Sequence, residues 1–557
     1  MRESWREGKK VKKRTLGNLT KWPDRKVECL RRVLRGDTLV SPEEVFVIER
    51  SLPHAHVEAV LGTIGRLGLD KVIASQRCRE RDLVLAMIAE QLIHPCSKLA
   101  TTRLWHTTTL AEELKVEDAD EDELYRAMDW LVRRQERIER KLADRHLSEG
   151  SLVLYDITSS SYEGRSCPLV RYGYNRDGKK GLPVIVYGVL TDEDGRPIAV
   201  DVYPGDTADP TTVPDQVKKL QERFGLSRVV LVGDRGMLTE TQIEHLKEHP
   251  GLGWISALRS GAIRKLVEGG ELQFSLFDQK NLAEIRSGEY PGERLIVCLN
   301  PLLAEERRRK RQELVAATEK RLEKVARQVR GRRRKPMGKA EIGLKVGKVL
   351  NRFKVGKHFR LRIDDGVFEW SRCEQSIRRE EALDGIYVIR TSEPKEKLSA
   401  EDTVRKYKSL AEVERAFRTL KSLEILVRPI RHRIDNRVRG HVFLCLLAYY
   451  VEWHMRKALA PLLFDDEERH EGRRKRDPVA PAKASLSAKR KKTTRSTQEG
   501  FPVHSFATLL KELATRCRHR CRMKSDPTGP ALRLLTRPTP LQTRAFQLLE
   551  LYPGKEN

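Results

Sequence analysis

Short apolar runs bounded by Gly, Ser and Thr alternate with amphipathic stretches through the middle of this chain. The clearest run is Leu152–Tyr155, which follows Glu149-Gly150 and precedes a Ser/Thr cluster. A run of that length with those flanks predicts a buried strand. The pattern places Asp156 at the carboxyl end of the strand, where the chain leaves the core. In open α/β sheets, ligand-binding groups collect at that edge.

A second apolar run, Val229–Val232, is also followed by a carboxylate. Gly233 and Asp234 come directly after it, and Gly236 lies two residues further on. The glycines permit positive φ or close backbone approach around the acid. Two apolar strands that each deliver a carboxylate predict that Asp156 and Asp234 lie side by side. A solvated turn is the alternative for either acid alone.

A third segment, residues 407–421, has the period of an amphipathic helix. Tyr407, Glu414 and Lys421 are seven residues apart, so one continuous helix would align them along a single stripe. An ordinary solvated helix face is the alternative interpretation. The stripe borders an apolar face made of Val413, Ala416, Phe417 and Leu420.

Three acids are therefore the candidate catalytic residues and metal ligands: Asp156, Asp234 and Glu414. Three carboxylates in one site repel each other, and such a cluster normally needs cations. Hard oxygen ligands suit Mg²⁺, for which Mn²⁺ can substitute. Two such ions can activate a nucleophile and stabilise a leaving oxygen in phosphodiester chemistry.

These motifs resemble those of the DDE transposases of bacterial insertion sequences, whose catalytic fold is RNase H-like. The insertion-sequence-four branch carries a signature of Tyr, two residues, Arg, three residues, Glu, six residues and Lys. Tyr407, Glu414 and Lys421 fall on this spacing, whereas Leu410 occupies the Arg position. The resemblance covers residues 150–455.

The resemblance implies a DNA transposase that cleaves the ends of a mobile element and transfers the strand into target DNA. Its partners would be double-stranded terminal repeats and target DNA, and its active complex would be a homodimer. Asp156–Ser159 and Gly233–Gly236 are similar to the first and second acid motifs of the family. The candidate DNA-binding residues are Tyr407, Lys421, the arginines near Leu410 and the basic string after the helix, namely Arg415, Arg418, Arg431 and Arg437.

The predicted fold class is α/β, an RNase H-like mixed sheet with flanking helices behind an all-helical N-terminal region. Gly181–Val189 and Pro197–Val202 predict a hairpin, because an Asp-Gly turn joins two β-rich runs. The third acid lies far along the chain from the second, so a β-rich and helical insertion must interrupt the core.

The expected organisation follows from these patterns. Residues 1–148 hold a basic arm and helices at 42–51, 56–67, 80–92 and 122–147, which bind DNA ends or serve only for packing. The remaining segments are the first part of the core (149–260), the insertion (261–385), the second part of the core (386–457), a basic flexible linker (458–500) and a C-terminal tail (501–557).

Composition narrows the choice of partner. A formal net charge of +29 on 557 residues implies an anionic partner, and nucleic acid is the obvious one. A membrane surface is the competing interpretation, but no apolar run approaches the about 20 residues that span a bilayer. The N-terminus lacks the apolar segment of a signal peptide. Nine scattered cysteines fit reduced thiols, and we expect a bacterial cytoplasmic protein associated with the nucleoid.

Three alternatives to a transposase remain at this stage. A two-metal endonuclease would cut DNA without joining strands. A DNA-binding protein with a decayed catalytic fold would keep the net positive charge of the chain. The one observation that favours this alternative is Leu410 at the Arg position of the signature. A membrane-surface protein is the last alternative.

Overall fold

A mixed sheet forms the centre of the computed structural model, which describes residues 1–37, 45–179, 181–273, 277, 281–332, 334–422 and 424–551. The strand order is β6-β5-β4-β7-β8-β13-β10-β9. The strands are β4 (Ser151–Ser161), β5 (Val184–Asp192), β6 (Pro197–Tyr203), β7 (Val229–Val232), β8 (Leu252–Ala257), β9 (Leu282–Ile285), β10 (Arg294–Leu299) and β13 (Ile386–Thr391).

The first five strands of this order have the topology of an RNase H-like sheet. β4, β5 and β6 form an antiparallel meander, and β7 and β8 continue the sheet in parallel with β4. The predicted hairpin is present, with Gly195 in its turn at φ +81°. The predicted α/β fold class is confirmed. β13 and β10 add antiparallel strands beyond β8.

The long helix α18 (Asp435–Leu459) joins the sheet to the N-terminal helices. It contacts β6 on one side and α5 and α8 on the other, and residues on all its faces are buried. A helix that is apolar all round belongs inside a core. The N-terminal helices are α3 (Ala55–Arg66), α4 (Leu69–Ile73), α5 (Arg79–Ile93), α6 (Lys98–Leu104), α7 (Leu110–Leu114), α8 (Glu121–Val132) and α9 (Gln135–His146).

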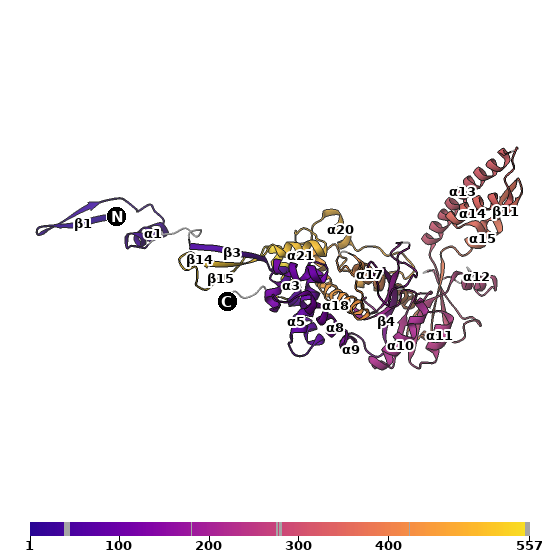
Figure 1. Cartoon of the computed structure of the whole chain (residues 1–557), viewed down its shortest axis with the longest axis horizontal. Helices are drawn as coiled ribbons and strands as arrows, with labels where there is room; N and C mark the ends of the chain where they lie inside the picture. The colour runs from indigo at the N-terminus through magenta and orange to yellow at the C-terminus, as the bar shows by residue number, and fades with distance from the viewer. Residues whose placement is uncertain are drawn as a thin grey trace.

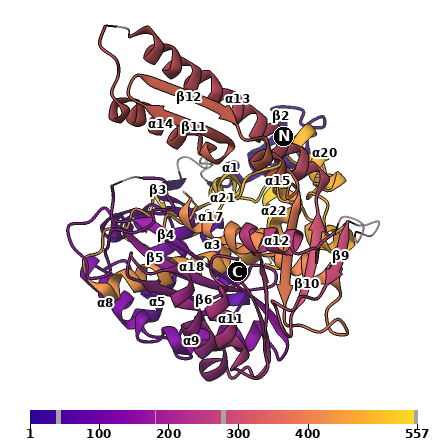
Figure 2. The same ribbon diagram turned by 90° about the vertical axis from the view of Figure 1, so that its right-hand side faces the viewer.

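The insertion contains a helical unit with its own hydrophobic core, and this unit projects from the body in both views (Figures 1 and 2). Within the predicted insertion, β9 and β10 belong to the central sheet instead. Arg311, the last residue of the basic run Arg307–Arg311, is buried and paired with Asp384. The elements of this region are α12 (Ser260–Glu268), α13 (Pro301–Gly331), α14 (Lys339–Phe353), β11 (Phe359–Asp364), β12 (Val367–Arg372) and α15 (Glu374–Glu381).

Segments near the two ends of the chain pair in a small sheet. β3 (Phe46–Pro53) pairs with β14 (Cys517–Met523), which pairs with β15 (Leu532–Leu535). The helix expected at 42–51 is therefore wrong from residue 46 onward, and residues 42–44 lie outside the described residues. A hydrogen bond of 2.7 Å between Ser51 and His519 crosses 468 positions of sequence, so no local pattern could reveal this strand.

The segments expected as a flexible linker and a tail also contain helices. α19 (Arg469–Lys475) and α20 (Leu486–Thr494) lie in the first, and α21 (Phe506–Ala514) and α22 (Pro540–Leu548) lie in the second. The basic arm forms β1 (Arg2–Glu7), β2 (Lys10–Thr15) and α1 (Asp24–Leu34). With β3, these strands show that the prediction of an all-helical N-terminal region is wrong.

None of the described helices is by itself long and apolar enough to cross a bilayer. α5 and the helical segment 98–107 pass that test only together, and they are bent by 87°.

Buried histidines make the stability of this fold sensitive to acid. His146 bonds Tyr450 at 2.8 Å, and burial together with the Arg196 guanidinium lowers its pKa to about 4. The same two causes lower the pKa of His454 to about 3. Both folded-state pKa values lie below the ordinary 6.5. The two histidines therefore contribute their full stability to the folded state above pH 6.5, where they are neutral, and this stability is lost as pH falls from there towards 4.

We expect the melting temperature to fall between pH 6.5 and pH 5, and His454→Gln to make that fall shallower. Replacing the exposed His245 by Gln is the matched control and should leave the fall in melting temperature between pH 6.5 and pH 5 unchanged. Differential scanning fluorimetry across pH measures this fall. An equally steep fall in wild type and His454→Gln would contradict the role given to His454.

Candidate active site

The ends of two parallel strands bring the first two acids together. β4 pairs in parallel with β7 only over Ser151–Leu154 and Val229–Val232. Asp156 and Asp234 each lie two residues beyond the last pair, so they are at the same level on strands that run about 4.8 Å apart. The expectation that Asp156 ends its strand is wrong, because β4 continues to Ser161 by pairing with β5.

The two neighbouring carboxylates, Asp156 and Asp234, concentrate negative charge at this edge of the sheet. Burial, and then the neighbouring charge of Asp234, raise the pKa of Asp156 to about 7, against a hydrogen bond from the Ile157 amide. Asp234 is exposed, and its Oδ1 accepts hydrogen bonds from the amides of Gly236 at 2.9 Å and Met237 at 2.8 Å. Two adjacent carboxylates of which one resists ionisation are a donor set that a hard divalent cation fits.

The helix expected over 407–421 is divided in two. α16 (Ala400–Lys408) and α17 (Leu410–Lys421) meet at Ser409, whose hydroxyl donates to the Lys406 carbonyl at 2.5 Å. A Ser that bonds the backbone in this way competes with helix continuation. Tyr407 and Glu414 are therefore on different helices, and the single stripe is wrong.

Tyr407 nevertheless lies close to two of the acids. Burial raises its pKa to about 12, and the charges of Asp234 and Glu414 add to the increase. Among the described residues, however, no group of three His, Cys, Asp or Glu side chains is close enough to hold a metal ion. The structure thus pairs Asp156 with Asp234 and brings Glu414 near Tyr407, without closing the three acids into one cluster.

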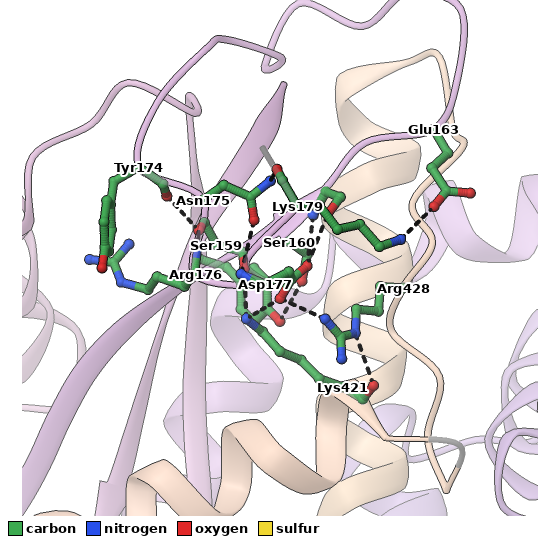
Figure 3. A network of polar contacts seen from close by, with 12 residues as sticks. Ser159, Ser160, Glu163, Tyr174, Asn175, Arg176, Asp177, Lys179, Lys421 and Arg428 are labelled. Carbon is green, nitrogen blue, oxygen red and sulfur yellow. Dashed lines mark hydrogen bonds and ion pairs between the residues drawn. The ribbon is translucent and has the colours of Figure 1, made fainter. Parts of the chain in front are cut away.

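Asp177 organises the other end of α17 (Figure 3). Its side chain is 1% exposed and forms ion pairs with Lys421 at 2.9 Å and Arg428 at 2.7 Å. Burial would raise the pKa of Asp177, but hydrogen bonds from Lys421 and Ser161 outweigh it and lower the pKa. Lys421 also donates to the Ser159 carbonyl at 2.6 Å, which ties α17 to β4.

The loop that carries Asp177 does more than turn the chain. Ser159 on β4 donates to the Tyr174 carbonyl at 2.8 Å and accepts from the Arg176 amide at 3.0 Å. The Arg176 guanidinium binds both carboxylate oxygens of Asp209, at 2.6 and 2.7 Å. Both charges of this pair act on Asp156, whose pKa Arg176 lowers and Asp209 raises.

The remaining predicted DNA-binding residues lie on α17, on the segment after it and at the start of α18. Arg415 and Arg418 are exposed on α17, and Arg431 is exposed and pairs with Glu163 at 3.4 Å. Arg437 is half-buried, with its guanidinium 4.4 Å from the Tyr125 ring centre.

Leu410, which stands at the signature Arg position, packs against the main hydrophobic core. An arginine at this position would place a charge beside the apolar residues of that core. The departure from the signature is therefore consistent with the local packing.

Comparison with known proteins agrees with this geometry. Residues 148–451 match the family model described as the transposase DDE domain. The match spans more than half of the chain and includes both halves of the sheet and all three acids, so the chain belongs to this family. It is a DNA transposase, an enzyme that uses divalent metal ions.

Among solved structures, the cryo-EM structure of the piggyBac transposase synaptic complex with hairpin DNA is similar. The identity is 11%, the match covers 82% of this chain and 76% of that chain, and the TM-score is 0.32. No curated protein matches the sequence.

Proposed function

We propose that this transposase cleaves the phosphodiester bond at each end of a bacterial mobile element and joins the freed 3′-hydroxyl to target DNA. The observation that carries the proposal is the placement of Asp156 and Asp234 side by side where β4 and β7 stop pairing. A substrate phosphate at this edge would meet both carboxylates. The similarity to the insertion-sequence-four signature in Tyr407, Glu414 and Lys421 supports the assignment to that branch.

Asp156, Asp234 and Glu414 would hold two Mg²⁺ ions, with Mn²⁺ as a substitute. Bound there, the ions would supply Lewis acidity for an attacking hydroxyl and a leaving oxygen. Asp156 must lose its proton to act as a ligand, so metal binding should release a proton near neutral pH. Glu414 has to approach the Asp pair when metal and DNA bind, because the three acids do not converge in the structure described here.

The other residues of the site position DNA. Asp177 holds the Lys421 ammonium at the end of α17, where it can face a phosphate as a point charge. The Tyr407 phenol lies near Asp234 and Glu414 and, with its raised pKa, stays protonated as a hydrogen-bond donor at neutral pH. Arg415 and Arg418 supply the exposed positive charge that Leu410 does not.

We also propose partners and location. The DNA partners are the terminal repeats of the element and the target duplex, and a homodimer would hold two element ends together. We expect the protein in the bacterial cytoplasm, associated with the nucleoid.

A strand-transfer assay separates this proposal from a nuclease that only cuts. We expect purified protein to join a pre-cleaved element end with a free 3′-hydroxyl to a supercoiled plasmid in Mg²⁺. An otherwise identical end that terminates in a 3′-dideoxynucleotide is the control and should give no joined product. Cleavage of uncut ends without any joining would assign the chain to the endonuclease alternative.

A further inference from the structure

Two neighbouring cavities lie beyond the acid pair. The charged side chains that line the Lys421 cavity, of about 830 Å³, are four cations, Lys179, Arg418, Lys421 and Arg428, and three carboxylates, Glu163, Asp177 and Glu424. A second cavity of about 610 Å³, here called the Lys98 cavity, lies between the N-terminal helices and the segment that follows α17. Both cavities are lined by Leu426 and Pro429, so they adjoin along one side of the molecule.

Lys98 gives the second cavity an uncompensated charge. Its side chain lines the cavity and the residue is only 4% exposed, yet no hydrogen bond or ion pair joins its ammonium to another residue in the described part of the chain. Burial lowers its pKa. Glu90 is the one carboxylate that acts on it, from beyond ion-pair distance, and Glu90 is itself 3.5 Å from His94. A buried ammonium without a partner is costly, and a bound anion relieves that cost.

The other charged side chains that line the Lys98 cavity are also positive. Arg431, Arg433 and Arg437 line the cavity, and no described Asp or Glu does. The Arg437 guanidinium stacks on Tyr125, which leaves its Nε buried without a hydrogen-bond partner among the described residues. His432 adds no charge at neutral pH, because burial lowers its pKa to about 4. All the charged side chains that line this cavity are therefore cationic.

We propose that the Lys98 cavity binds a phosphodiester group of the DNA strand that passes the Lys421 cavity. The inference rests on the proposed function, and it adds an anchoring point at the junction with the N-terminal helices. A strand is favoured over a free anion because the cavity adjoins the Lys421 cavity, whose lysine is the residue proposed above to face a DNA phosphate. A backbone with regularly spaced phosphates can occupy both at once.

The test compares Lys98→Met with Lys71→Met, which removes one exposed lysine from the same helical region and does not line the cavity. Binding of a labelled element-end duplex is measured by fluorescence anisotropy in EDTA over a range of NaCl concentrations. We expect Lys98→Met to weaken binding at least about tenfold, as the loss of one charged hydrogen bond does. The slope of log affinity against log salt should become shallower by about 0.9, the value for one phosphate contact. Lys71→Met should match wild type.

Two further measurements keep the proposal falsifiable. Lys98→Met should melt no lower than wild type without DNA, because it removes an unpaired charge; a large drop in melting temperature would assign Lys98 a structural role instead. Inorganic phosphate at constant ionic strength is the second probe. If it stabilises wild type but not Lys98→Met while the salt slopes are equal, the site holds a free anion and the strand proposal is overturned.

The proposed function fails separately from this inference. It fails if wild type does not nick element ends in Mg²⁺, whatever the salt slopes are. Equal slopes in wild type and Lys98→Met overturn the inference alone.

Discussion

Replacing Asp156 by Asn should reduce metal-dependent cleavage of element ends at least about 1,000-fold, equivalent to about 4 kcal/mol in the activation barrier. Asn keeps the size of the side chain but cannot supply the negative charge that a hard cation needs. Asp156 lies on a strand that is paired with β5 on one side, so the backbone should not change. Gel-based cleavage of end-labelled DNA measures the loss.

Two comparisons show that the loss arises from the site. Asp206→Asn, at an exposed carboxylate on the loop after β6, is the matched control and should cleave like wild type. Calorimetric titration with Mn²⁺ should show binding to wild type that Asp156→Asn lacks, while DNA affinity in EDTA stays within about twofold. An Asp156→Asn protein that cleaves at a comparable rate would remove Asp156 from the metal site.

Replacing Asp177 by Ala should lower the free energy of unfolding by about 2–4 kcal/mol, because removing one partner of a buried pair leaves the other charges uncompensated. Lys421 is 12% exposed and Arg428 is 35% exposed, so solvent screens part of this effect. Denaturant titration at pH 7 measures it. The pKa of Asp177 is below 3.8, so its contribution is present above that value and is lost as pH falls below it.

The same substitution should also disturb the active site, since Asp177 fixes Lys421 against β4. Asp177→Asn retains the shape and an acceptor for Ser161, so it should recover part of the stability without recovering full cleavage. Glu163→Gln is the matched control, because its pairs with Lys179 and Arg431 are at the surface, where solvent screens them and they contribute little to stability. Equal stability of Asp177→Ala and wild type would contradict the role given to this carboxylate.

The parts of the site that the sequence could predict are those with local patterns. The apolar runs before Asp156 and Asp234 indicated two strands, and parallel pairing then places both acids at one level. The N-cap of α16 is likewise local, because Ser399 accepts a hydrogen bond from the amide of Asp402, three residues further on. Each of these features depends on residues that are neighbours in sequence.

The remaining features depend on contacts between distant residues. Asp177 stands in an ordinary polar loop, and its partner Lys421 is 244 positions away, so no local pattern could distinguish it from a turn residue. The break at Ser409 was missed because the apolar period runs unchanged through it, whereas the hydroxyl bond to Lys406 stops the helix. Lys98 carried no signal at all, since only tertiary packing shows that its charge is buried.

Incubation of the protein with Mg²⁺ and labelled DNA carrying the ends of its own genetic locus tests whether the three acids cut element ends, with Glu414→Gln alongside. We expect metal-dependent nicking at the element boundary by wild type and none by Glu414→Gln, because we propose that Glu414 completes the acid site once DNA and metal are bound. Both proteins should bind the labelled ends. Binding by wild type without cleavage, in either Mg²⁺ or Mn²⁺, would instead indicate a DNA-binding protein whose catalytic site has decayed.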